Sequence, residues 1–312
     1  MPEDSAGEGR FRRLALVGLG LIGSSIARGA RGHNLADAIV AIDADPAVIA
    51  RVRTLDLADE ATTDLAAVAD ADLVILCVPV GAYGAVAAAM APHLAPGAIV
   101  SDVGSVKGAV VGAVAPHLPE GVHFVPAHPV AGTEHSGPDA GFAALFRGRW
   151  CILTPPEGAD PAAVARLAAF WTGLGSNVET MTPAHHDLVL AITSHVPHLI
   201  AYNIVGTAAD LEAVTQSEVI KFSAGGFRDF TRIAASDPTM WRDVFLTNKD
   251  AVLEMLGRFN EDIAALARAI RWGDGDALFD LFTRTRAIRR GIVSTGQDAP
   301  DADFGRHRGE TS

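Results

Sequence analysis

The sequence predicts an α/β protein in which a doubly wound, mostly parallel sheet precedes an all-helical region. In the first half of the chain, short apolar runs alternate with helical segments, as they do when helices connect parallel strands. From residue 183 onward, apolar residues recur at helical spacing and no run reads as a strand. We therefore expect one domain over residues 1–182, a helical domain over residues 183–290, and a disordered polar tail over residues 291–312.

The expected elements follow from these runs. Strands are predicted at residues 14–17, 39–42, 73–78, 98–101, 122–125, 151–154 and 177–180. Helices of the first domain are predicted at residues 24–30, 83–90, 106–114 and 162–171. Helices of the second half are predicted at residues 187–210, 211–222, 243–272 and 276–290. Pro197 should kink the first helix of that group, because proline removes a helix hydrogen bond.

The composition is that of an ordinary globular protein and not of a disordered chain. The chain has 312 residues, of which 49% are hydrophobic and 20% are charged. Its net charge of −12 argues against nucleic acid or an anionic membrane as a partner, because both repel an acidic surface. Cys77 and Cys151 both lie in apolar runs, so we expect buried free thiols in a reducing compartment.

The chain shows no sign of secretion or of a membrane anchor. Residues 1–9 are acidic and glycine-rich, and they lack the basic and apolar regions of a signal peptide. The most apolar stretch, residues 65–91, is interrupted by two aspartates, a proline and a glycine, so it should not span a bilayer as one helix. We expect a cytoplasmic protein.

A glycine pattern follows the first predicted strand and opens the first predicted helix. Gly18, Gly20 and Gly23 form G-x-G-x-x-G, and Asp43 ends the next strand about twenty residues later. In Rossmann-type folds these glycines allow a tight turn, close approach of a pyrophosphate and helix–strand packing, while the acid binds a ribose. The alternative is a glycine-rich turn of another α/β protein. The expected cofactor-binding residues are Gly18, Gly20, Leu21, Ile22, Gly23, Asp43, Val78, Pro79 and Ser105.

The residues after Asp43 favour NAD over NADP. Ala44 and Asp45 follow it, and no arginine stands beside it to neutralise a 2′-phosphate. Arg51 and Arg53 lie further along and are the reason that NADP stays possible.

His128 is the first candidate for acid/base chemistry. It stands between Pro126 and Pro129 just after the strand predicted at residues 122–125, so its backbone is restrained. Ligands of open parallel sheets sit beyond the carboxyl ends of the strands, and histidine titrates near neutral pH. The alternative is a structural turn histidine bonded to backbone.

A second polar cluster lies at residues 101–107, at the end of a strand. Ser105 either caps the following helix or hydrogen-bonds the cofactor or His128 across the crevice. Lys107 lies in the first turn of that helix, where the dipole disfavours a cation, which hints at a ligand or carboxylate partner.

His195 and His198 are three residues apart, so they share one face of an otherwise apolar helix. No third ligand stands at a suitable spacing, so we reject zinc and expect no metal. We expect one of the pair to be a substrate donor and the other a core histidine.

Arginines and aromatic residues follow the glycine pair at residues 225–226. Arg232 is expected to grip a substrate carboxylate, and Arg228 to form a bridge to Asp229 or Glu134. Trp241 either walls a pocket or belongs to the core.

Together these segments resemble the prephenate/arogenate (cyclohexadienyl) dehydrogenase family. The similarity lies in residues 18–25, 102–107, 128–134, 194–198, 226–232 and 236–243, and it extends over residues 14–290. The first motif is shared by many dehydrogenases, whereas the others together are specific. The resemblance implies oxidative decarboxylation of prephenate to 4-hydroxyphenylpyruvate or of arogenate to tyrosine, in tyrosine biosynthesis. It also implies a nucleotide-binding domain followed by a helical dimerisation domain.

By the same resemblance, His128 is the catalytic histidine that meets the ring hydroxyl, and Ser105 orients it and the nicotinamide. His195, His198, Arg232, Thr133 and Trp241 are the implied substrate-binding residues. Glu134, Arg228 and Asp229 match an ionic group at the site entrance; some relatives have lysine where Arg228 stands. Tyrosine, shaped like the product, would compete with substrate at this site.

Two other classes compete with this reading. A β-hydroxyacid dehydrogenase would use a catalytic lysine of the helical half, where Lys221 and Lys249 stand, but it would leave His128 unexplained. A nucleotide-sensing protein without catalysis would not need His128, Ser105 and Arg232 together.

Overall fold

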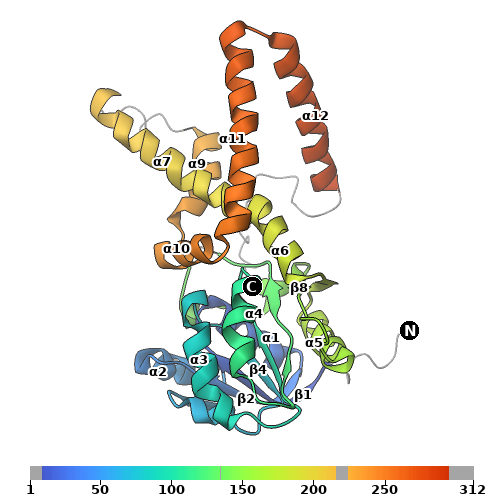
Figure 1. Cartoon of the computed structure of the whole chain (residues 1–312). Coiled ribbons are helices and arrows are strands. Elements are labelled where there is room, and N and C mark those ends of the chain that lie inside the picture. Colours follow the sequence, from blue (N-terminus) through green and yellow to red (C-terminus); the bar gives the residue numbers. More distant parts are fainter. Residues whose placement is uncertain (1–8, 134, 216–223, 295–312) are drawn as a thin grey trace. The chain divides into compact units, whose positions relative to one another are not determined.

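The computed structural model describes residues 9–133, 135–215 and 224–294 (Figure 1). It divides into two compact units. The first consists of Met1–Leu199 with Ala235–Val252, and the second of Ile200–Ala234 with Leu253–Ser312. The units are thus not two consecutive blocks of sequence, and the predicted domain boundary at residue 182 stays a prediction.

A six-stranded parallel sheet forms the centre of the first unit. Its strands are β1 (Phe11–Val17), β2 (Ala36–Ile42), β3 (Glu60–Thr62), β4 (Leu73–Leu76), β5 (Ile99–Asp102) and β6 (His123–Phe124). They lie in the order β3-β2-β1-β4-β5-β6, and every pairing is parallel. The order reverses between β1 and β4, which is where ligands bind in such sheets. The predicted doubly wound sheet is confirmed.

Helices connect these strands. They are α1 (Leu21–Gly32), α2 (Pro46–Thr54), α3 (Tyr83–Met90) and α4 (Gly108–Val114), and α3 and α4 lie side by side against the sheet (Figure 1). The helix α2 was not predicted, although its start is well marked. Asp45 accepts a hydrogen bond from the amide of Ala47 at 2.8 Å, and Pro46 occupies the first helical position.

A separate three-stranded sheet corrects the expected arrangement. β7 (Ala127–Pro129) pairs antiparallel with β8 (Trp150–Leu153), which pairs parallel with β9 (Asn177–Thr180). His128 therefore lies within a short strand and not in a turn beyond β6. The small sheet and α5 (Pro161–Gly173) share one core with the large sheet, where Phe11, Phe146, Phe170 and Trp171 meet edge to face.

The cysteines differ from expectation in one respect. Both are free thiols, but only Cys151 is buried, whereas Cys77 is partly exposed at the end of β4.

The helical part begins at Pro183, earlier than residue 187. α6 (Pro183–Leu190) runs through a π-helical turn (Ala191–His195) into α7 (Val196–Thr215). The turn lies just before Pro197, whose nitrogen has no hydrogen to donate to the preceding turn. The stretch Pro183–Leu211 is long and apolar enough to cross a membrane by length and composition, a test that the core helix of a soluble protein also passes.

The remaining helices are α9 (Gly225–Thr231), α10 (Pro238–Thr247), α11 (Lys249–Trp272) and α12 (Gly275–Ser294). The helix predicted at residues 243–272 is thus two helices that meet at Asn248, and α9 was not predicted. The helix predicted at residues 211–222 lies partly outside the described residues, and α7 continues through Thr215. The predicted tail starts too early because α12 continues to Ser294; its residues 295–312 lie outside the described part.

Short 3₁₀ helices complete the chain. They cover Leu65–Val68, Val80–Ala82, Ala91–His93, Ala115–His117, Pro138–Ala140, Ala143–Phe146 and Arg232–Ala235.

Candidate active site

The glycine loop between β1 and α1 is shaped as the motif requires. Gly18 has a φ of +100°, and a Cβ there would lie 2.7 Å from the backbone of Cys77. A Cβ on Gly23 would lie 2.0 Å from the carbonyl oxygen of Gly18. A Cβ on Gly20 would meet nothing within 4 Å. The loop is therefore packed against its neighbours at two glycines and open at Gly20, the residue that precedes α1.

The acid at the end of β2 lies beside this loop. Asp43 accepts a hydrogen bond from the amide of Leu19 at 2.8 Å and another from the amide of Asp45 at 3.0 Å. Val78 and Pro79 follow Cys77, whose backbone touches Gly18, so they border the loop from β4. The fold therefore brings the predicted cofactor residues of β1, β2 and β4 to one edge of the sheet.

Arg51 and Arg53, the two arginines that could bind the 2′-phosphate of NADP, both hydrogen-bond other residues of the chain. Nε of Arg51 donates to both carboxylate oxygens of Asp139, at 2.9 and 3.0 Å. Nη2 of Arg53 donates to the carbonyl of Ala61 at 2.5 Å.

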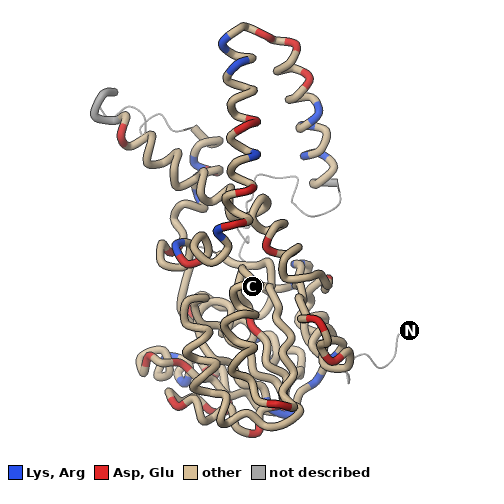
Figure 2. The backbone as a smooth tube through the Cα atoms, in the orientation of Figure 1, with Lys and Arg blue, Asp and Glu red and all other residues tan. Residues whose placement is uncertain are grey.

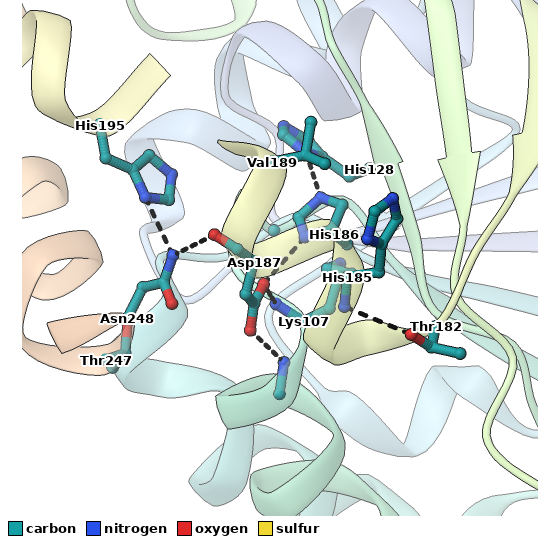
Figure 3. A network of polar contacts seen from close by, with 12 residues as sticks. Lys107, His128, Thr182, His185, His186, Asp187, Val189, His195, Thr247 and Asn248 are labelled. Atoms are coloured by element: carbon teal, nitrogen blue, oxygen red, sulfur yellow. Dashed lines mark hydrogen bonds and ion pairs between the residues drawn. The ribbon is translucent and has the colours of Figure 1, made fainter. Parts of the chain in front are cut away.

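His128 lies in β7 with 8% of its surface exposed. Its Nδ1 is 2.8 Å from Nε2 of His186 in α6, and the two rings meet at 68° with centroids 5.0 Å apart (Figure 3). Burial, reinforced by the nearby His186, Lys107 and His195, holds the pKa of His128 well below its ordinary value. The imidazole is therefore neutral at neutral pH, as a general base must be.

His186 contacts Asp187 in turn. Nδ1 of His186 is 2.8 Å from Oδ1 of Asp187, and the amides of Lys107 and Gly108 donate to the two oxygens of that carboxylate at 2.7 and 2.8 Å. Burial alone would raise the pKa of Asp187, but the hydrogen bonds from His186, Gly108 and Lys107 outweigh it and hold the pKa below its ordinary value.

Lys107 has the carboxylate partner that its position hinted at. The fully buried Nζ donates to Oδ2 of the equally buried Asp102 at 2.5 Å and to the carbonyl of Ala127 at 2.6 Å. Asp102 also accepts from the amides of Gly104 and Ala127, at 2.7 and 3.3 Å. Ala127 precedes His128, so this ion pair fixes the strand that carries the histidine.

Ser105 does not cap the following helix, because α4 begins after Lys107 and has no side-chain cap. Within the described part of the chain, no residue hydrogen-bonds the Ser105 hydroxyl. The structure instead gives His128 a different partner, His186. A role of Ser105 toward the cofactor stays a prediction.

The helix-borne histidines differ in their surroundings, while a substrate role for either stays a prediction. His195 is fully buried, its Nδ1 lies 3.1 Å from Nδ2 of Asn248, and burial lowers its pKa to about 4. His198 is half-buried and stacks on Trp241. His195 is thus the core histidine of the pair, and the shared face predicted from their spacing meets Trp241.

The other predicted site residues are more scattered. Thr133 is exposed in the first unit, and its Oγ1 accepts from the amide of His135 at 3.3 Å. Arg228 and Asp229 lie in α9, and Arg232 begins the next 3₁₀ helix; all three belong to the second unit. Glu134 and Lys221 lie outside the described residues. The expected ionic group at the entrance therefore stays a prediction.

His186, Asp187 and Asn248 belong to this cluster but were not predicted as site residues, and Asp102 was predicted only as part of the segment 102–107. A signal for two of them was present: His185, His186 and Asp187 are consecutive titratable residues at the start of an apolar helix. Asn248 was overlooked because the helical pattern runs through it.

The open glycine loop, the acid beside it and a buried neutral histidine define a nucleotide-dependent dehydrogenase. Comparisons with known proteins agree. The family description "Prephenate dehydrogenase, nucleotide-binding domain" matches residues 26–180, and "Prephenate dehydrogenase, dimerization domain" matches residues 182–284. The chain belongs to the prephenate dehydrogenase family and is an oxidoreductase.

Individual relatives agree with this assignment. A cyclohexadienyl dehydrogenase of Zymomonas mobilis is 44% identical over 280 residues, which are 89% of this chain and 95% of the relative. The crystal structure of prephenate dehydrogenase from Aquifex aeolicus with hydroxyphenyl propionate and NAD+ is 34% identical, has a TM-score of 0.85, and covers 90% of this chain and 98% of its own. Synechocystis arogenate dehydrogenase is 28% identical with a TM-score of 0.78, over 90% of this chain and 99% of its own. These relatives favour this family over the β-hydroxyacid dehydrogenase alternative.

Proposed function

We propose that the chain oxidatively decarboxylates prephenate to 4-hydroxyphenylpyruvate and arogenate to tyrosine, with NAD, as a cytoplasmic homodimer. One observation carries the proposal: a buried, neutral His128 in β7 is paired with a second histidine, His186. The names of the relatives supply the two substrate classes, and the NAD+ complex of one relative supports the cofactor.

His128 has the properties that this reaction demands of a base. The ring hydroxyl must lose its proton as its carbon gives up hydride, and a neutral imidazole accepts that proton. The O–H and C–H bonds at that carbon break, an N–H bond forms on His128, and the hydride leaves to the acceptor that bound NAD would supply. The C–C bond to the departing carbon dioxide then breaks, its electron pair makes the ring aromatic, and the phenolate oxygen takes the proton back from His128. Because aromatisation releases carbon dioxide, the overall reaction is irreversible.

The residues of the glycine loop fit a dinucleotide. The backbone at Gly20 has open space for a pyrophosphate, and the amino end of α1 favours the negative charge of that group. Asp43, which lies beside the loop, would hydrogen-bond a ribose hydroxyl. NAD, when bound, supplies the hydride acceptor. The held Arg51 and Arg53 leave no cation beside Asp43 among the described residues, which supports NAD over NADP.

The substrate carries at least one carboxylate, and the chain is acidic overall, so the site needs a local cation. Arg232 is the proposed grip because a guanidinium binds a carboxylate with two hydrogen bonds. Thr133, His198 and Trp241 complete the proposed substrate side.

A dimer is supported by the family of the helical part and by its surface. The helices α11 and α12 carry charges of both signs along their length (Figure 2). The helical part matches a dimerisation-domain family, and the same two helices also expose large apolar side chains. These are Ile263, Ile270, Trp272, Phe279, Phe282 and Ile288. Sedimentation at micromolar concentration should give a dimer of the 32.4 kDa chain, and a monomer would contradict this part of the proposal.

The function is tested by mixing the full chain with NAD and either prephenate or arogenate and following absorbance of reduced nicotinamide. His128→Asn should keep NAD affinity and lose turnover on the order of 10²-fold or more. His117→Asn, at an exposed histidine of the same unit, is the control. No reduction of NAD with either substrate, or near-normal turnover of His128→Asn, would overturn the proposal.

A further inference from the structure

We propose that His186 and Asp187 are positioning residues that fix which ring nitrogen of His128 acts as the base. The structure assigns the proton of neutral His128 to Nδ1 and leaves Nε2 to accept the substrate proton. This inference rests on the proposed function only for its catalytic consequence, because the tautomer itself is a property of the free protein.

The assignment starts at Asp187, which can only accept. Its two oxygens receive hydrogen bonds from the amides of Lys107 and Gly108, at 2.7 and 2.8 Å, and a backbone amide always donates. These bonds anchor both oxygens, and because they help to hold the pKa of Asp187 below its ordinary value, the carboxylate is ionised at neutral pH. Nδ1 of His186, 2.8 Å from Oδ1, must carry a hydrogen and donate it.

The position of the hydrogen on His186 determines the position of the hydrogen on His128. A neutral imidazole has one donor and one acceptor, so His186 with its hydrogen on Nδ1 offers a lone pair on Nε2. That nitrogen lies 2.8 Å from Nδ1 of His128, which must then be the donor of this pair. Nε2 of His128 is left with a lone pair, and none of the described residues hydrogen-bonds it.

The opposite assignment requires His186 to be doubly protonated. Burial lowers the pKa of His186, and the pairing with Asp187 opposes this without reversing it. His186 is therefore neutral at neutral pH, and its Nε2 stays an acceptor. A cationic His186 would also stand beside Lys107, a charge that disfavours it.

Lys107 contacts both Asp187 and the residue that precedes His128, which are the two ends of this series of hydrogen bonds. Its amide donates to Asp187, and its Nζ donates at 2.6 Å to the carbonyl of Ala127, the residue before His128. The distance between the carboxylate and the base is thus fixed by one buried residue and its partner Asp102. Such an arrangement holds a catalytic ring by its supporting contacts, as a catalytic constellation requires.

The groups that surround the two rings are few. His128 faces His186 in α6, Lys107 before α4, His195 in the π-helical turn, and Cys151 across β8. His186 faces Asp187, Lys107 and Asp102. Apart from Asp187 and Asp102, these groups are neutral or cationic. The hydrogen bonds of His128 lead through His186 to one of the two anions, Asp187.

The first experiment reads the tautomer directly. Nitrogen NMR of the full-length protein with ¹⁵N-labelled histidine should show His128 protonated at Nδ1 and unprotonated at Nε2 at neutral pH. His186→Leu removes the acceptor and should return His128 to a mixture of tautomers or to the Nε2–H form. A wild-type His128 protonated at Nε2 would overturn the inference, whether or not the protein is active.

The second experiment measures turnover. His186→Leu should lower kcat on the order of 10- to 10³-fold, since removing an orienting carboxylate that touches the base directly costs about 10⁴-fold in a serine protease. The substrate KM should stay within a few-fold. His186→Gln keeps an acceptor oxygen and should recover part of kcat, whereas a role in folding alone would not separate Leu from Gln.

His185→Leu is the matched control, because His185 is the exposed neighbour of His186. Asp187→Asn should lower kcat in the same sense as His186→Leu. Wild-type kcat in His186→Leu would overturn the inference. If His128→Asn instead retained activity while NMR showed the expected tautomer, the proposed function would fail and the tautomer assignment would stand.

Discussion

The imidazole of His198 stacks on the indole of Trp241, with ring centroids 3.7 Å apart and planes inclined by 24°. Trp241 also meets the buried His195 edge to face at 6.0 Å. Nδ1 of His198 lies 2.8 Å from the carbonyl of Ser194 and therefore donates to it. Trp241 thus holds the half-buried histidine against the core.

Removing the indole should disturb substrate binding more than chemistry. Such an aromatic contact contributes about 0.5–1.5 kcal/mol, so Trp241→Ala should raise the substrate KM about 2- to 10-fold through a loosened His198. Trp241→Phe should recover most of this. Steady-state kinetics at saturating NAD checks it, and an unchanged KM in the alanine variant would contradict a binding role.

The pH dependence of kcat/KM should reflect the depressed pKa of His128. The base works in its neutral form, and burial holds that pKa well below 6.5, so protonation removes activity only at lower pH. Activity should therefore be retained at pH 6.5 and fall as the pH drops further. A pH profile of the wild-type enzyme checks this, and an acidic limb centred at or above 6.5 would contradict it.

The cofactor preference should depend on the engagement of Arg51. The wild-type enzyme should have a higher kcat/KM with NAD than with NADP. Asp139→Ala frees the guanidinium of Arg51 and should raise kcat/KM for NADP relative to NAD. The ratio of the two, measured for both proteins, is the readout. A wild type that prefers NADP would refute the role assigned to Asp43.

Arg232 should govern both substrate and tyrosine binding. Arg232→Ala should mainly raise the substrate KM, because a carboxylate grip acts in the ground state and transition state alike. Tyrosine should inhibit in competition with substrate, less in Arg232→Ala, and without changing the KM for NAD. Loss of kcat at unchanged KM, or tyrosine inhibition that persists at saturating substrate, would argue for another arrangement.

The buried pair of Lys107 and Asp102 should be costly to break. Lys107→Met leaves a carboxylate buried without its cation and should lower the free energy of unfolding by about 3–5 kcal/mol. Lys107→Met combined with Asp102→Asn removes that charge and should recover part of the loss. Urea unfolding of the three proteins measures the difference, and equal stability of the single and double variants would contradict the argument.

The sequence predicted best where one local segment determines the structure. Gly18, Gly20 and Gly23 are a strand–turn–helix motif on their own, and the structure forms that turn. The prolines beside His128 marked it correctly as a restrained residue. The parallel sheet was also predictable, because its central strands contain short apolar runs such as Leu73–Leu76.

The contacts that the sequence hid are those between distant segments. His128 and His186 are 58 residues apart, and their pairing depends on a three-residue strand that carries little pattern of its own. Asn248 breaks an amphipathic helix without a glycine or proline to mark it, because its side chain is used to bond Asp187 and His195. Both cases are tertiary contacts overriding local preference.

The return of Ala235–Val252 to the first compact unit affects when that unit can complete its folding during synthesis. Asn248 donates to the backbone carbonyl of Asp187 and contacts His195, so the cluster around His128 lacks a member until that residue is synthesised. Domains generally complete folding as units while the chain leaves the ribosome, amino-terminal part first. Here the first unit cannot complete its folding until Ala235–Val252 has been synthesised, and that segment follows Ile200–Ala234 of the second unit. A chain that stops before this segment has every strand of both sheets yet leaves its histidine cluster unfinished.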